Sequence, residues 1–346
     1  MVSSKVYFYE NLFDIRGGVD SFLSLIAQDY GKTNNPVGVK IHFGDKENVT
    51  HIKPEWIIGL KDHFANPVFI ECNVLYRSPR TKRDTHLKLA KEHGFDFLPI
   101  DILDGEIGQD VLEVEVNTKN TKFAKLGKGL SKYKKCIALS HFKGHMEAGF
   151  GGALKNIGMG LGSRAGKLAM HSSVSPIFKS EACIGCSKCA EDCPVNAITV
   201  APKARVDKNK CIGCAHCIAV CPQGAIRIPW KSDPAERVME KIADYAMGAM
   251  KGREWRFINF LTNITMHCDC VSGRQEPITP DIGILYSHDP VAIDQASFDL
   301  FRKANGGRDP FKEHHRIDGE HILPYAEKLG IGTTKYELVR FGPNKK

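Results

Sequence analysis

Residues 183–194 read Cys183-Ile-Gly-Cys186-Ser-Lys-Cys189-Ala-Glu-Asp-Cys193-Pro194, and residues 211–222 repeat the pattern as Cys211-Ile-Gly-Cys214-Ala-His-Cys217-Ile-Ala-Val-Cys221-Pro222. Both halves have the form C-x2-C-x2-C-x3-C-P, and a short apolar run follows each of them. Disulfide scaffolds belong mostly to small secreted domains, whereas eight of the twelve cysteines in this 346-residue chain fall within 39 residues. The spacing therefore predicts metal coordination.

The repeat resembles that of the bacterial two-cluster ferredoxins, in which eight thiolates hold two [4Fe–4S] clusters. Three cysteines of one tight loop reach three irons of the same cluster, and the fourth ligand comes from the other half of the repeat. We therefore expect two [4Fe–4S] cofactors, held by Cys183, Cys186, Cys189 and Cys221 in one case and by Cys211, Cys214, Cys217 and Cys193 in the other. A pair of zinc sites is the alternative, but zinc requires neither the third cysteine nor the repeated Cys-Pro ending.

Outside the repeat, short β-branched and aromatic runs alternate with amphipathic stretches. The predicted strands are Lys5–Tyr9, Val37–Phe43, Val68–Cys72, Phe97–Ile100, Cys136–Ser140, Phe257–Leu261 and Ile282–Ser287. The predicted helices are Val19–Tyr30, Pro54–Phe64, Asp84–His93, a helix capped by Asp233, and Val291–Asn305. This alternation predicts an α/β fold with an open, largely parallel sheet and flanking helices.

The alternation stops where the cysteines begin and resumes after them. We expect a discontinuous α/β host domain, residues 1–177 and 232–346, interrupted by a small α+β two-cluster ferredoxin-like domain at residues 178–231. This inserted segment, the cysteine module, carries six Lys and Arg residues against four acidic residues between Glu181 and Ile228. A slightly basic module is suited to packing on a host domain or to binding an acidic electron donor. We therefore expect a small redox carrier or a reductase as the partner.

The composition is that of a globular protein, with 42% hydrophobic and 25% charged residues. No apolar run is long enough to span a bilayer, and the N-terminal residues lack the pattern of a secretory signal, which together predict a cytoplasmic location. The formal net charge of +8 is spread along the chain rather than gathered in one stripe, so we expect no nucleic-acid partner.

Several sequence blocks resemble domain-of-unknown-function family 362 (DUF362), whose members often carry a ferredoxin insert. The blocks are residues 39–44 (Val-Lys-Ile-His-Phe-Gly), Asn73-Val-Leu-Tyr76 with Arg80-Thr81 and His86, residues 141–160 beginning His-Phe-Lys-Gly-His, Cys268-Asp269-Cys270, and Asp281-Ile-Gly-Ile with Asp289-Pro-Val-Ala-Ile-Asp294. The resemblance implies a host domain with a ligand or metal site. It assigns no activity.

Four polar residues of these blocks follow predicted strands: His42, Asn73, His141 and Asp289. In open α/β sheets ligands bind outside the carboxyl ends of the strands, so we expect these residues at one rim. The candidate catalytic residues are His42, His141, Lys143 and His145. A metal pair or an acid/base site is one interpretation of His141 and His145, and a loop histidine beside a capping one is the other.

Cys268-Asp269-Cys270, with His267 beside it, is a candidate third metal site. Residues two apart in an extended segment point to one face, so both thiols could reach one ion together with His42, His141 or His145, a donor set that suits zinc, nickel or iron. The alternative is two inert buried thiols.

Three basic residues are candidates for binding a small anionic ligand or cofactor: Arg80, Lys155 and Lys167. Arg80 lies in a basic loop before a predicted helix, a placement that can hold an anion. Lys167 ends a stretch from Gly149 to Gly166 that contains seven glycines, which we interpret as a loop, either closing over a ligand or plainly structural. Solvated surface charges are the alternative for all three.

Two functional hypotheses of different classes follow. The first is an oxidoreductase in which electrons enter through two clusters and reach a ligand or metal in the α/β domain, because roughly 290 residues of host domain would be of little use to a mere carrier. The second is a non-catalytic redox partner, or a protein that delivers a metal or cofactor for assembly.

Overall fold

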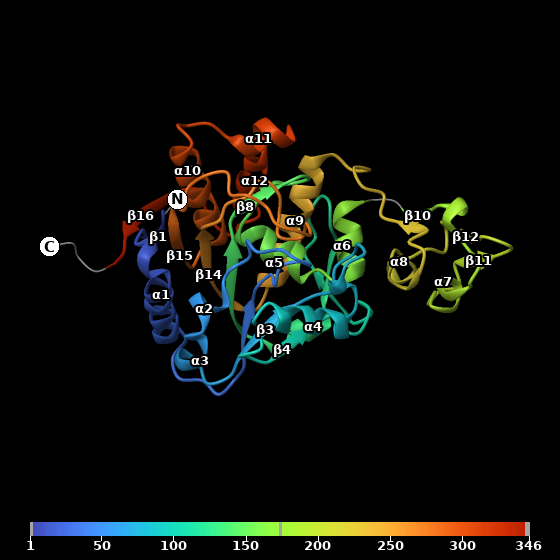
Figure 1. Ribbon diagram of the computed structural model, residues 1–346, viewed down its shortest axis with the longest axis horizontal. Helices are drawn as coiled ribbons and strands as arrows, with labels where there is room; N and C mark the ends of the chain where they lie inside the picture. Colours follow the sequence, from blue (N-terminus) through green and yellow to red (C-terminus); the bar gives the residue numbers. More distant parts are fainter. Residues whose placement is uncertain (1–2, 173–174, 343–346) are drawn as a thin grey trace.

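The computed structural model describes residues 3–172 and 175–342. Its centre is an eight-stranded sheet with the strand order β16-β1-β15-β14-β7-β2-β3-β4 (Figure 1). The strands are β1 (Ser4–Tyr9), β2 (Val37–Lys40), β3 (Pro67–Glu71), β4 (Ile100–Ile102), β7 (Lys135–His141), β14 (Glu254–Leu261), β15 (Gly283–Ser287) and β16 (Tyr336–Arg340). Among the described strands of this sheet, β15 alone runs antiparallel to its neighbours. The predicted open, largely parallel α/β sheet is confirmed.

Helices cover both faces of the sheet, and each face has its own apolar core. On one face lie α1 (Ile15–Tyr30), α2 (Pro54–Ile57), α3 (Leu60–His63) and α4 (Arg83–Glu92). On the other lie α5 (Ala153–Leu161), α9 (Ala235–Met250), α10 (Pro290–Ala304), α11 (Pro310–His315) and α12 (Ile322–Lys328). The helix α6 (Arg164–His171) lies at the side of the host that faces the cysteine module (Figure 1).

Most predicted elements occur within a few residues of their expected bounds. The strand expected at Phe97–Ile100 instead begins at Ile100, and the helix expected at Pro54–Phe64 is split around Gly59. The sequence patterns missed two hairpins, formed by β5 (Val111–Glu115) with β6 (Phe123–Gly127) and by β8 (Lys143–His145) with β9 (Gly149–Gly151).

Of the two aspartates that were expected to cap helices, one does and the other does not. Asp289 caps α10, because its Oδ1 accepts hydrogen bonds from the backbone N–H groups of Val291 and Ala292 at 2.8 and 2.9 Å. Asp233 does not cap α9, which begins at Ala235. Its carboxylate contacts the Lys241 ammonium at 2.7 Å instead.

The antiparallel direction of β15 also corrects the expected rim. Because β15 runs against its neighbours, its carboxyl end lies at the opposite edge of the sheet from those of β2, β3 and β7. Asp289 therefore lies away from the rim, where its Oδ2 accepts a hydrogen bond from the Ser4 hydroxyl at 2.7 Å. The prediction that it joins the rim was wrong because periodicity does not reveal strand direction.

The cysteine module has small sheets of its own. The strand β10 (Ile177–Phe178) pairs with β13 (Ile226–Arg227), and β11 (Ile198–Val200) pairs with β12 (Ala204–Val206). Two short helices, α7 (Lys188–Glu191) and α8 (His216–Val220), complete it. In Figure 1 the module projects from the host beside α6. The strands of the module pair with one another in small sheets of their own, which is compatible with the predicted division of the chain into a host domain and an inserted domain. That division stays a prediction.

Asp294 connects α10 to the start of α5. Its carboxylate accepts hydrogen bonds from the backbone N–H groups of Ala153 and Leu154 at 2.6 and 2.9 Å, and from the Asn259 amide at 2.8 Å. We expect Asp294→Ala to lower the free energy of unfolding by roughly 2–4 kcal/mol, because these buried donors lose their acceptor. This difference is measured by urea unfolding followed by circular dichroism. The exposed Asp84→Ala in α4 serves as a control and should stay within about 0.5 kcal/mol of the parent; equal effects would contradict the assignment.

Candidate functional site

A cavity of about 420 Å³ opens at the carboxyl ends of the parallel strands. Lys40 ends β2, Glu71 ends β3, and Lys143 follows β7, and all three line the cavity. Apolar side chains form much of the remaining wall: Val74, Leu75, Met146, Met159, Trp230 and Val271. A wall of this kind, with a few polar groups converging on it, is the usual setting for a small-molecule ligand.

The Cys268-Asp269-Cys270 segment is anchored through its central residue. The Asp269 carboxylate lies 2.8 Å from His141 Nδ1 and 3.4 Å from Lys143 Nζ, and it accepts a hydrogen bond from the Thr50 hydroxyl at 3.1 Å. Burial alone would raise the pKa of Asp269, but these positive groups hold it well below its ordinary value. With Asp269 turned into the protein, Cys268 and Cys270 both face the cavity and are joined by a disulfide.

His145 is the histidine that accompanies these two cysteines. One ring nitrogen of His145 and the two sulfur atoms all lie within 4.8 Å of one another, a separation that one metal ion could span if the thiols were reduced. Burial, followed by the charges of Lys155 and His171, holds the pKa of His145 well below its ordinary value, so the ring is neutral near pH 7. Of the histidines considered for this site, the structure therefore places His145 there. His267 lines the same cavity but groups with His314 and His315.

Two predicted catalytic histidines hold other side chains in place. Both ring nitrogens of His141 are engaged, Nδ1 by Asp269 and Nε2 by the carbonyl of Thr262 at 2.9 Å. His42 lies with Nε2 2.8 Å from Arg80, and burial together with that guanidinium keeps its pKa well below the ordinary value. His141 thus positions Asp269, and His42 is a neutral residue of the cavity wall.

Most cations of the cavity already have partners. Lys40 contacts Glu71 at 2.9 Å, Arg80 contacts Asp45 at 3.1 Å, and Lys167 donates to the carbonyls of Gly160 and Gly162. These groups brace the wall. The predicted anion-binding roles of Arg80 and Lys167 therefore have less support than that of the remaining candidate.

Lys155 is the exception. Among the described residues it has no hydrogen-bond or ion-pair partner, and its accessible part faces the cavity. Burial, followed by the positive charge of Lys143, lowers the pKa of Lys155 to about 7. A cation in this position lacks a counter-ion that a bound anion would supply.

The glycine-rich stretch does not form a loop. Residues 149–166 form β9, α5 and the start of α6. Glycine allows close packing here, since a Cβ on Gly158 would lie 2.2 Å from the carbonyl oxygen of Ile242, and one on Gly166 would lie 2.1 Å from that of Lys125. Both loop interpretations were therefore wrong.

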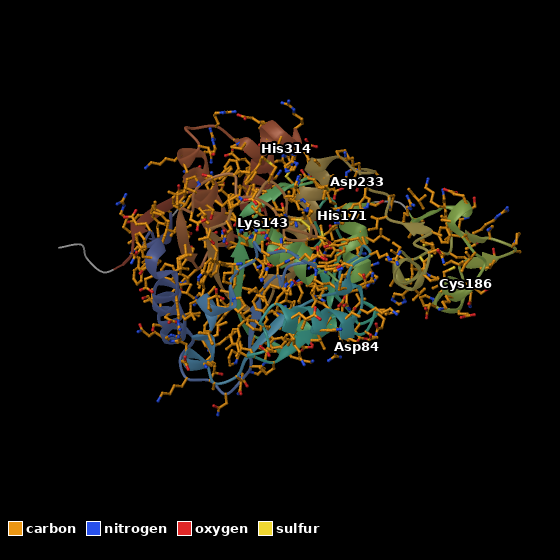
Figure 2. The ribbon with its side chains drawn as sticks, in the orientation of Figure 1. Asp84, Lys143, His171, Cys186, Asp233 and His314 are labelled. Atoms are coloured by element: carbon orange, nitrogen blue, oxygen red, sulfur yellow. A yellow bond between two sulfur atoms is a disulfide. The ribbon has the colours of Figure 1, made fainter. Side chains whose placement is uncertain are left out.

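The eight cysteines of the module surround two further cavities. The outer cysteine set, Cys183, Cys186, Cys189 and Cys221, lines a small cavity of about 20 Å³. The inner cysteine set, Cys193, Cys211, Cys214 and Cys217, lines another of about 20 Å³. Cys186 is exposed, and Figure 2 shows it on the far side of the module from Lys143 and His171.

The inner cysteine set adjoins the host. Ala215, next to Cys214, packs in one apolar cluster with Leu75, Leu168 and Ile228. Leu75 also lines the large cavity, and Leu168 follows Lys167 on α6. The inner cysteine set and the large cavity thus adjoin the same small apolar cluster.

Sequence reasoning missed several cavity residues: Lys40, Glu71, Glu147, His171 and Trp230. A signal existed for Lys40 and Glu71, because a charged residue inside an apolar strand must find a partner when buried. The pair formed by Glu147 and His171, 2.7 Å apart, and the edge-on contact of Trp230 with His171 at 4.7 Å between ring centroids had no sequence signal.

No helix among the described residues is long and apolar enough to cross a membrane.

Comparisons with known proteins give a family and two distant structural similarities. No curated protein matches the chain. A crystal structure of a protein from Thermotoga maritima aligns with 84% of this chain and 59% of its own, at 10% identity and a TM-score of 0.43. The lactate racemase apoprotein from Thermoanaerobacterium thermosaccharolyticum aligns with 75% of this chain and 51% of its own, at 12% identity and a TM-score of 0.38. The chain thus spans little more than half the length of either protein.

The family comparison covers most of the chain. The model described as "Domain of unknown function (DUF362)" matches residues 37–299, which include the strands that border the large cavity and the whole cysteine module. This chain therefore belongs to the DUF362 family.

Proposed function

We propose that this protein is an iron–sulfur oxidoreductase, in which electrons pass through two [4Fe–4S] clusters of an inserted ferredoxin-like module to the large cavity of the α/β host. The observation that carries the proposal is the position of the inner cysteine set: Ala215, next to Cys214, packs in one apolar cluster with Leu75, which lines the same cavity as Cys268 and Cys270.

The grouping of the thiols supports the proposed clusters. Each small cavity is lined by three cysteines of one loop and by one cysteine from the other half of the repeat, which is the ligand pattern expected for two cubanes. Backbone amides also point at the ligand sulfurs: Ala197 N–H donates to Cys193 Sγ and Ala225 N–H to Cys221 Sγ, both at 3.2 Å. Donors of this kind stabilise the extra electron of a reduced cluster.

The exposure of the two sets suggests a direction. The outer cysteine set includes the exposed Cys186, where a small redox carrier or a reductase could approach. The inner cysteine set contacts the host through Ala215. Electrons would therefore enter at the outer set and leave from the inner one.

The Cys268–Cys270 disulfide is a suitable acceptor. Its reduction to two thiols consumes two electrons and two protons, and two clusters that each transfer one electron could supply the electron pair. Lys155 and the apolar wall would hold a small anionic ligand beside the thiols. His145 could share a metal ion with them once they are reduced.

The second candidate function is delivery of a metal or cofactor without catalysis. The observation that favours it is the same group of His145, Cys268 and Cys270, since the disulfide releases and the dithiol binds a soft metal ion. Here the clusters would set the binding state, and no substrate would be converted.

The proposal is tested on anaerobically purified protein. We expect about eight irons and eight sulfides per chain. A low-potential donor should then reduce the clusters and convert Cys268 and Cys270 into two thiols that alkylation and mass spectrometry detect. Cys270→Ser should keep the iron and lose the reducible disulfide, and Cys72→Ser, at another cavity cysteine, should keep both. Iron-free protein would overturn the proposal, and full clusters beside an unreduced disulfide would overturn the electron path.

A further inference from the structure

We propose that His267, His314 and His315 form a second metal site, which binds a divalent transition metal such as Zn²⁺ through nitrogen alone. One ring nitrogen from each of the three residues lies within 4.8 Å of the other two. Imidazole is a ligand for zinc, copper, iron and nickel. The site is independent of the proposed clusters and shares no residue with the group of His145, Cys268 and Cys270.

The end of α11 supplies two of the ligands. His314 and His315 are the last residues of this helix, which begins with Pro310 after the N-cap Asp309. Phe311, which is 1% exposed, stacks on Phe301 of α10 with 4.3 Å between ring centroids. The short helix is therefore packed against the core, which holds the backbone of His314 and His315 in place.

A hydrogen bond fixes the third ligand relative to the helix. His315 Nε2 lies 2.8 Å from the carbonyl oxygen of Met266, the residue before His267. A ring that donates through Nε2 carries its lone pair on Nδ1, so this contact leaves Nδ1 of His315 free for a metal. Metal-binding histidines usually have a partner of this kind.

The loop that carries His267 is itself held closely. Thr265 Oγ1 donates to the carbonyl of His267 at 2.7 Å, and Gly144 N–H donates to the carbonyl of Thr265 at 2.9 Å. The loop can approach the backbone of residue 144 this closely only because that residue is glycine, since a Cβ there would lie 2.1 Å from the carbonyl oxygen of Met266.

An unsatisfied nitrogen of His267 also indicates a ligand. Nδ1 of His267 is buried and has no partner among the described residues, although a buried polar nitrogen normally finds one. Within the same described ranges, no carboxylate forms an ion pair with any of the three rings, which lie with centroids 4.8 to 5.5 Å apart. A metal ion would satisfy the three nitrogens together.

The position of the site suggests an open coordination sphere. His267 lines the large cavity, whereas His314 is exposed and appears at the surface in Figure 2. Three protein ligands with one open position are typical of catalytic rather than structural zinc. A metal here would lie at the rim of the cavity, since His267 lines it and is followed directly by the Cys268–Cys270 segment.

The test uses the full chain with its clusters in place and Zn²⁺ as the probe. Equilibrium dialysis of the protein with the Cys268–Cys270 disulfide oxidised should show one Zn²⁺ bound per chain, and His314→Ala and His315→Ala should each weaken Zn²⁺ binding at least about tenfold without changing the iron content. The exposed His288→Ala should have no effect. Zn K-edge absorption of the oxidised protein should show nitrogen or oxygen neighbours at about 2.0–2.1 Å and no sulfur near 2.3 Å.

Two further results separate the sites. Binding that persists in Cys268→Ser/Cys270→Ser protein supports the three-histidine site, because that variant destroys the other metal-binding group. Sulfur in the first shell, or binding unaffected by His314→Ala and His315→Ala, would overturn the proposal. Neither outcome bears on whether the cysteine module holds iron.

Discussion

Cys214→Ala is expected to lower the iron content from about eight to about four per chain and to slow reduction of the Cys268–Cys270 disulfide at least about a hundredfold. Cys214 belongs to the inner cysteine set, and its neighbour Ala215 contacts the apolar cluster that includes Leu75 of the cavity wall. In the proposed electron path, loss of the inner cluster would therefore stop electrons at the step that enters the host. The outer cysteine set keeps all four of its ligands.

This result is measured by iron analysis, by electron paramagnetic resonance of the reduced protein and by the rate of thiol appearance at Cys268 and Cys270. A remaining reduced-cluster signal would show that the module is still folded. Cys136→Ala is the matched control, because Cys136 is a buried cysteine of β7 that lies outside both sets. Undiminished thiol formation in Cys214→Ala would show that electrons reach the disulfide by another path.

Most strands of the large sheet could be predicted from the sequence, because they are apolar runs bounded by turn residues. Val68–Cys72 predicted β3 within one residue at each end, since a strand buried on both faces must be continuously apolar. The direction of β15 could not be predicted, because an antiparallel strand of this composition has the same pattern as a parallel one. This single reversal removed Asp289 from the rim.

The candidate site could be predicted only in outline. The spacing of Cys268 and Cys270 predicted that both face one way, and Asp269 between them points to the opposite side. The sequence could not decide between His145 and His267 as their companion, because that choice depends on how the β8–β9 hairpin meets the loop after β14. The spacing of the cysteine repeat predicted two sets of four thiols, and each set lines one small cavity, while the clusters themselves stay a prediction.

The cations show the same limit. Lys155 and Lys167 both lie near glycines, and nothing in the sequence separates them. In the folded chain Lys167 donates to two carbonyls at the end of α5, whereas Lys155 lies in the first turn of that helix and lines the large cavity. Which lysine is left for a ligand is decided by contacts between elements.

Lys155→Met is expected to weaken binding of a small apolar anion at least about tenfold and to remove the pH dependence of that binding. Lys155 has no counter-ion among the described residues, and its pKa lies at about 7, so it is mostly charged at pH 6 and mostly neutral at pH 8.5. Calorimetry with benzoate, which stays ionised throughout this range, should therefore show tighter binding to the parent protein at pH 6 than at pH 8.5. Methionine keeps the length and the apolar stem.

The exposed Lys231→Met is the matched control, because Lys231 lines the same cavity. It should change benzoate affinity less than about twofold and keep the pH dependence. Benzoate binding that does not vary with pH in the parent protein would contradict the assignment, as would a Lys155→Met protein that retains full affinity. Four other charged groups act on Lys155, namely Lys143, Glu147, Lys40 and Asp269, and all remain in both variants.

The same lysine also affects stability, and the sign follows from its lowered pKa. An unfolded lysine titrates near 10.4, so between about pH 7 and pH 10 the unfolded chain binds more protons at this position than the folded one. Lys155 therefore makes the folded state more stable as the pH rises through this window, and the contribution is lost when Lys155 becomes methionine. Relative to Lys155→Met, the parent protein should be least stable below pH 7, where the half-buried ammonium stays charged without a partner among the described residues. A bound anion supplies that partner, so ligand binding and the stability deficit have a single physical cause.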